Sequence, residues 1–199
     1  MDEAGESAEA KRLERERDLY LRLLNLGLQE DLGPFLEDAL ALVAQVIDAH
    51  QGYLEIAPTS DEGDPPRWWA AHGFSDDEID GVRSTISRGI IAAALQSGET
   101  IVTRSAVHDA RFEARQSVQD ARIEAVICAP IGSAPPFGAV YLHRRIAPGP
   151  FLDDHRKTVE LFARHLTPFA ERLVSRSLAS SRTDPTQDLR RTLRLTGVV

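Results

Sequence analysis

Six polar side chains that could bind a ligand lie close together between two apolar parts of the sequence. They are Arg104, His108, Asp109, Arg111, Arg115 and Asp120. An imidazole with neighbouring carboxylates can hold ferrous iron, so metal binding is one possible chemistry for this group. The histidines are scattered and do not pair at the spacing of metal or catalytic sites, and none of the serines lies in a Gly-x-Ser-x-Gly elbow. The sequence therefore predicts no catalytic arrangement, and the chain is not expected to be an enzyme.

The elements on either side of this polar segment are predicted from their apolar patterns. An amphipathic helix is expected over residues 87–97, with Ser87 as its cap and Gly98 as its end. The strands that follow are expected at residues 100–103, 125–131 and 137–145. Residues 104–124 show no sustained periodicity, which predicts a surface excursion between two strands. Excursions of this size are usually functional or mobile.

The rest of the chain alternates helical and strand patterns. Helices are expected at about residues 11–28, 35–50 and 155–178 and from Asp76, and strands at 53–57 and 67–72. Residues 1–10 have little to bury and are expected to be disordered or to fray, and Gly33-Pro34 is expected to break the chain. Pro168 should kink the last helix. Trp68 and Trp69 are neighbours in one strand and should therefore point to opposite faces.

Several of these segments resemble a known family. The run Ser-Arg-Gly-Ile before a helix, the stretch TRSAVHDARFEARQSV, and the strands AVICAPI and FGAVYL are similar to a GAF domain, the small-molecule sensor module of signalling proteins. The resemblance extends over residues 23–172. It implies an α/β (α+β) fold with a central, mostly antiparallel sheet of about six strands, helices on both faces and flanking signalling helices. GAF domains bind cyclic nucleotides, bilins, haem, metals or small metabolites, so the resemblance leaves the ligand or cofactor unidentified.

The resemblance places an unidentified small-molecule ligand beneath residues 103–122. The side chains expected to bind it are Trp69, Thr103, Arg104, His108, Arg111, Cys128 and Tyr141. The stretch Asp109–Phe112 resembles a structural motif of the family, in which the aspartate caps a turn and the phenylalanine packs inward, so no metal is expected. Cys128 lies in an apolar strand and should be a buried neutral thiol. Because GAF enzymes that reduce free methionine sulfoxide use several cysteines, a single cysteine argues against that activity.

The last ten residues, RRTLRLTGVV, resemble the linker that precedes the AAA+ ATPase domain of bacterial sigma-54-dependent transcriptional activators. This resemblance implies a regulatory domain of a longer protein, with an AAA+ output domain and RNA polymerase carrying sigma-54 as partners. Residues 1–22 would then be a charged segment that begins a signalling helix, residues 23–176 the GAF domain, and residues 177–199 a linker toward the output domain.

The composition argues against several other classes of function. A net charge of −8 is unlike the basic surface of proteins that bind nucleic acid directly. The single cysteine argues against an internal disulfide framework or a cysteine-built zinc site. The chain has no apolar run long enough for a membrane span, and its acidic start differs from a secretory signal. A cytoplasmic protein that does not contact membranes is therefore expected.

A second interpretation is a ligand-free module that acts through dimerisation. Leucines recur through residues 13–28 among charged residues, which is typical of an amphipathic helix that can pair with its twin as a short coiled coil. In this interpretation the C-terminal helix contributes to the homodimer, and aromatic side chains of the domain fill the pocket. A polar cavity of roughly 300 Å³ or more would instead favour ligand sensing.

Overall fold

The computed structural model describes residues 3–57, 67–75, 88–103, 125–144 and 149–183. Within these residues the helices are α1 (Glu3–Leu26), α2 (Leu32–Val46), α5 (Arg88–Ser97) and α7 (Asp153–Thr183). The strands are β1 (Gln51–Ile56), β2 (Trp68–His72), β3 (Ile101–Thr103), β4 (Ala125–Ile131) and β5 (Gly138–Arg144). The helix expected from Asp76, the excursion at 104–124 and the final segment from residue 184 lie outside the described residues.

The described strands form one antiparallel sheet in the order β2-β1-β5-β4-β3. The α+β fold with a mostly antiparallel sheet is thereby confirmed; about six strands were expected, and five are present in the described ranges. β4 has the predicted bounds, and β5 begins one residue later than predicted, while its predicted last residue, Arg145, lies outside the described residues. β4 is an apolar run, and β5 is apolar from Gly138 to Leu142 before it ends in His143 and Arg144; such runs are typical of central strands.

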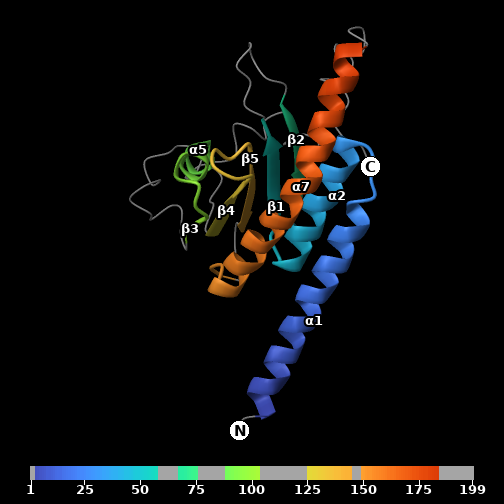
Figure 1. Ribbon diagram of the computed structural model, residues 1–199. Coiled ribbons are helices and arrows are strands. Elements are labelled where there is room, and N and C mark those ends of the chain that lie inside the picture. Colours follow the sequence, from blue (N-terminus) through green and yellow to red (C-terminus); the bar gives the residue numbers. More distant parts are fainter. Residues whose placement is uncertain (1–2, 58–66, 76–87, 104–124, 145–148, 184–199) are drawn as a thin grey trace.

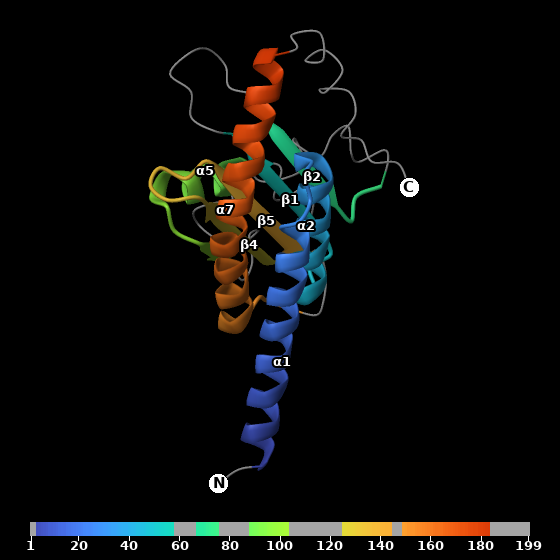
Figure 2. The same ribbon diagram turned by 45° about the vertical axis from the view of Figure 1, so that its right-hand side comes forward.

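Helices cover both faces of the sheet (Figures 1 and 2). α5 packs on one face, which we call the α5 face, over a cluster that includes Ile90, Tyr53 and Tyr141. α2 and α7 cover the opposite face, which we call the helical face, and α1 packs against both of them. The main core lies on the helical face and includes Phe35 and Phe162. The prediction of helices on both faces is confirmed.

α2 begins earlier than its sequence pattern suggested. Gly33 and Pro34 do not break the chain but lie in the first turn of α2, which starts at Leu32 after the N-cap residue Asp31. Proline is tolerated in the first turn because the backbone N–H groups there have no partner within the helix. Leu32 is buried, so the extra turn adds apolar contact to the core.

α1 and α7 project beyond the sheet at opposite ends of the domain (Figures 1 and 2). α1 is helical from Glu3, so disorder, one of the two expectations for residues 1–10, is wrong over Glu3–Ala10, and the other, a fraying start, stays a prediction. α7 holds α1 through an edge-on contact between the rings of Tyr20 and His165, whose centroids are 4.9 Å apart. Pro168 lies inside α7, which continues through it. The predicted kink at this proline stays a prediction.

No helix in the described part of the chain is long and apolar enough to cross a membrane.

Candidate functional site

The cross-strand register collects one residue from each of the five strands in a row on the α5 face. In strand order the row is Ala71, Tyr53, Tyr141, Cys128 and Ile101. Directly paired residues of antiparallel strands point to the same face, so these five side chains lie side by side. All of them belong to the α5-face cluster, in which Tyr53, Tyr141 and Cys128 are fully buried. The row forms a largely apolar floor with two phenol rings.

Polar side chains form the next row on the same face. Gln51 pairs with His143, His143 with Val126, and Val126 with Thr103. Gln51, His143 and Thr103 are all buried. The α5 face therefore places an aromatic row directly beside a row that carries buried hydrogen-bonding groups. Such a combination is typical of small-molecule sites, where apolar walls bind the body of a ligand and a few polar groups orient it.

The hydrogen bonds of Gln51 determine the orientation of its side-chain amide and show which ring nitrogen of His143 carries a proton. Gln51 Nε2 donates to the carbonyl oxygen of Gly73 at 3.0 Å, and that oxygen can only accept. Gln51 Oε1 therefore faces His143 Nε2, 2.8 Å away. Because the amide oxygen can only accept, His143 Nε2 carries the proton of this bond. The rings of Tyr141 and Phe74 contact the imidazole, with centroids 5.6 and 6.3 Å from it.

The thiol of Cys128 is protonated and unreactive in this environment. Burial raises the pKa of Cys128 far above its ordinary range, and the negative charge of Glu55 raises it further. A reactive cysteine needs the thiolate and partial exposure, and Cys128 has neither. Its place in the row makes it a packing neighbour of Tyr141 on the adjacent strand.

The structure brings together the predicted site residues that it describes. Trp69, Thr103, Cys128 and Tyr141 lie on the α5 face, on four different strands. Trp68 and Trp69 are half-buried against opposite faces, as predicted for neighbours in a strand. Arg104, His108 and Arg111 lie outside the described residues.

Sequence reasoning missed Gln51, Tyr53 and His143. His143 could have been found, because it shares a strand face with Tyr141 by simple alternation. Gln51 and Tyr53 depend on the register between β1 and β5, for which the sequence holds no local signal. No group of three or more His, Cys, Asp or Glu side chains in the described ranges is arranged to hold a metal ion.

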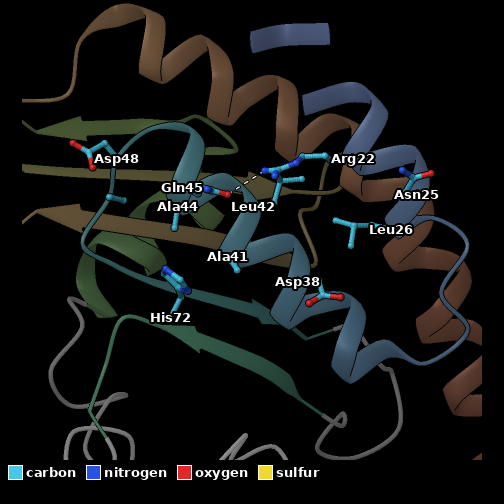
Figure 3. A pocket seen from close by; sticks show the side chains of 11 residues that line it. Arg22, Asn25, Leu26, Asp38, Ala41, Leu42, Ala44, Gln45, Asp48 and His72 are labelled. Atoms are coloured by element: carbon cyan, nitrogen blue, oxygen red, sulfur yellow. Dashed lines mark hydrogen bonds between the residues drawn. The ribbon is translucent and has the colours of Figure 1, made fainter. Parts of the chain in front are cut away.

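A groove of about 640 Å³ lies away from the α5 face, between α1, α2 and the end of β2 (Figure 3). Its lining residues are Arg22, Asn25, Leu26, Asp38, Ala41, Leu42, Ala44, Gln45, Asp48, Ala49 and His72. Arg22 donates to Gln45 Oε1 at 3.0 Å across it, and burial lowers the pKa of His72 at its edge. A second groove, of about 620 Å³, lies beside the first half of α7 and includes Arg164 and Thr167. Neither groove contains a predicted site residue.

Comparison with known proteins gives a consistent picture of the fold. The family model described as GAF domain matches residues 31–167. The GAF domain of a phosphoenolpyruvate-protein phosphotransferase from Acinetobacter superposes with a TM-score of 0.60 at 10% identity, over 85% of this chain and 95% of that one. A GAF domain assigned to a sensor histidine kinase of Pseudomonas syringae pv. tomato gives a TM-score of 0.56 at 16% identity, over 89% and 97%.

An enzyme is also among the similar structures. The free methionine-R-sulfoxide reductase from Neisseria meningitidis, solved in complex with its substrate, gives a TM-score of 0.55 at 16% identity, over 84% of this chain and 93% of that one. At this level of identity the likeness concerns the fold alone. A comparison with curated protein sequences found no match.

Proposed function

The chain belongs to the GAF domain family, a family of regulatory sensory and signalling modules, and from this premise we propose that it is a sensory domain that binds a small molecule on the α5 face. The observation that carries the proposal is the cross-strand register, which places Cys128 and Tyr141 directly beside the buried polar row of Gln51 and His143. Trp69 lies on the same face, on the other side of the row that holds Tyr53 and Tyr141. The four predicted binding residues that are described come from separate strands, and their convergence supports a common site. The proposed role is regulatory and needs no catalytic group.

The chemistry of the α5 face favours a ligand with a flat apolar part and a hydrogen-bonding group. Tyr53, Trp69 and Tyr141 are the aromatic side chains of this face, the two tyrosines being buried in the cluster with α5, and planar apolar groups pack well against such rings. Gln51, His143 and Thr103 can exchange hydrogen bonds with a polar group at one end of such a molecule. Arg104, His108 and Arg111 complete the proposed binding set on the basis of the family resemblance.

The proposed output is an AAA+ domain that acts on RNA polymerase carrying sigma-54. The resemblance of RRTLRLTGVV to the linker of such activators supports this assignment. α7 ends at Thr183, shortly before that segment in the sequence, which would make residues 177–199 the connection to the output domain and residues 23–176 the sensory unit. A ligand that binds two arrangements of α7 unequally would shift the balance between them. An activator of this kind works in the cytoplasm.

Native mass spectrometry of the freshly purified domain tests the sensory function. We expect a species heavier than the polypeptide, whose additional mass is lost on denaturation. The size of the lost mass separates a metal ion from an organic ligand. A domain that retains nothing, and that shows no shift of α5-face resonances with any member of a metabolite library, would contradict the sensory function.

A ligand-free dimerisation module is the second candidate, and one feature of α1 favours it. Four leucines in the second half of α1, near its middle and just beyond its end are largely exposed: Leu13, Leu21, Leu24 and Leu28, at 54%, 53%, 61% and 80%. Leu19 and Leu23 already bury the other side of the helix in the core. A second copy of the chain would cover the exposed leucines and pair α1 with its twin, with α7 contributing to the same contact. The same mass spectrum reports the subunit number and so tests this candidate as well.

A further inference from the structure

Arg144 is a buried cation whose guanidinium group is surrounded by backbone carbonyl oxygens. It is the last residue of β5 and is 3% exposed. Nε donates to the carbonyl of Asp48 at 2.9 Å, and Nη2 donates to that of Ile47 at 2.5 Å. Nη1 donates to the carbonyls of Gly149 at 3.2 Å and Pro150 at 3.5 Å. One side chain therefore connects three separate parts of the chain.

The first connection is to the C-terminal end of α2. Ile47 is the C-cap residue of α2 and Asp48 follows it. Carbonyl groups at a helix C-terminus lack partners within the helix and carry the negative end of its dipole, so a cation binds them favourably. Burial lowers the pKa of Arg144, and the nearby charge of Asp48 opposes this change. Arginine stays charged in either case, which makes the contact persistent.

The second connection is to the segment that leads into α7. The guanidinium carbon lies 4.2 Å from the centroid of the Phe151 ring, and Phe151 is buried two residues before α7 begins. The bonds to Gly149 and Pro150 are longer than those to the end of α2, so they are the weaker pair. Gly149 has a φ of 98° and open space around the position of a side chain. The α7 side of the contact is therefore the side that can change.

The same strand carries the candidate ligand-binding residues. Tyr141 and His143 point from β5 to the α5 face, and Arg144 follows His143 and points to the opposite side of the sheet. A displacement of β5 that begins at the α5 face must therefore move the backbone that bears Arg144. Because the guanidinium holds Gly149, Pro150 and Phe151, the displacement reaches the residues just before α7.

We propose that Arg144 is the positioning residue that couples β5, and with it the sensory α5 face, to the start of α7. The inference rests on the proposed sensory function, since it assigns the route by which occupation of the α5 face would reach the output helix. The planar guanidinium is needed because it donates in several directions from one rigid group. A lysine would keep the charge but could not hold the end of α2 and the start of α7 in the same geometry.

The coupling is tested with a substitution on the α5 face, which disturbs that face as a bound ligand would. Cys128→Ala removes the buried sulfur beside Tyr141 and disturbs the α5 face without changing any charge. The measurement is the change in amide 1H and 15N chemical shifts of residues 151–155 caused by this substitution. It is made in three backgrounds: the unsubstituted domain, Arg144→Lys and Arg172→Lys. Arg172 is the matched control, because it also donates to backbone carbonyls, but those are the carbonyls of Gly27 and Gln29, which lie outside β5, the end of α2 and the start of α7.

We expect Cys128→Ala to shift the amides of residues 151–155 in the unsubstituted and Arg172→Lys domains, and we expect the shifts to be lost with Arg144→Lys. Gly149→Ala provides a second way to break the contact if Arg144→Lys does not fold, since it strains the loop at its positive φ. The proposal would be overturned if the shifts persisted in both the Arg144→Lys and the Gly149→Ala domains. It would also be overturned if Cys128→Ala caused no shifts in the unsubstituted domain. Because no ligand is used, the result is independent of the mass spectrometry that tests the sensory function.

Discussion

The indole ring of Trp69 stacks on the phenol ring of Tyr53, with centroids 6.0 Å apart and planes 26° apart. The two residues are diagonal neighbours on β2 and β1, because Trp69 pairs directly with Glu55 and Tyr53 with Ala71. Tyr53 also donates a hydrogen bond to Glu55 Oε2 at 3.0 Å. The stack therefore fixes β2, an edge strand, to the centre of the α5 face.

Substitution of Trp69 should lower the free energy of unfolding by an amount that depends on whether an aromatic ring remains at this position. We expect Trp69→Ala to reduce the free energy of unfolding by about 2 kcal/mol, because it removes half-buried area and an aromatic pair. Trp69→Phe should cost about 1 kcal/mol or less, since a ring remains over Tyr53. Urea unfolding of the three proteins measures both values. Equal losses for alanine and phenylalanine would show that the stack contributes nothing.

Gly73 and Gly98 offer a matched comparison of backbone strain with and without a steric clash. Both have positive φ, 75° and 69°. A Cβ at Gly73 would overlap the carbonyl oxygen of His50, whereas a Cβ at Gly98 would meet nothing within 4 Å. We expect Gly98→Ala to cost about 1 to 2 kcal/mol from conformation alone, and Gly73→Ala to cost more than about 3 kcal/mol. Thermal unfolding monitored by circular dichroism compares them, and similar melting temperatures for the two variants would contradict the prediction.

Much of the fold could be predicted because its strands and helices carry local signals. β4 is an uninterrupted apolar run, and its bounds were predicted without error. The start of α2 was not predicted correctly, because a proline such as Pro34 breaks a helix in its interior but is tolerated in its first turn. Only the buried contact of Leu32 shows that the turn belongs to the core.

Only part of the candidate site could be predicted from the sequence, because the rest depends on pairing between strands that are distant along the chain. Alternation along β5 places Tyr141 and His143 on one face, and this needs only the sequence. That Gln51 lies opposite His143 depends on the register of strands 92 residues apart along the chain. The role of Arg144 could not be predicted from the sequence at all, because its partners are backbone carbonyls, which every residue has.

The buried thiol of Cys128 should make stability fall in alkaline solution. Its pKa is raised in the folded state, so the unfolded chain loses this proton at a lower pH than the folded one. The contribution of the neutral thiol is fully present below the ordinary pKa of cysteine, near 8.5, and is lost as the pH rises above it. Above this pH the slope should approach roughly 1.4 kcal/mol per pH unit for this one group.

Urea unfolding between pH 7.5 and 10 measures this slope, and Cys128→Ala is its control. The variant should be less stable at pH 7.5 but should lack the part of the slope due to the thiol. The thiol should also react with a thiol reagent only after unfolding, because it is fully buried. Rapid labelling of the native protein would contradict the burial of Cys128.

The exposed leucines of α1 should determine the oligomeric state and have little effect on the fold. Leu21 and Leu24 are 53% and 61% exposed, so their replacement by glutamate should hardly change the stability of one subunit. In a dimer that buries them, the double variant Leu21→Glu with Leu24→Glu should weaken association by roughly 100-fold or more, because each buried leucine contributes about 1.5 to 3 kcal/mol. Leu23→Ala is the matched control, since Leu23 is 2% exposed and packs into its own core; it should cost about 3 kcal/mol of folding stability. Sedimentation equilibrium at several concentrations measures association, and an unsubstituted domain that sediments as a monomer throughout would contradict the second candidate function.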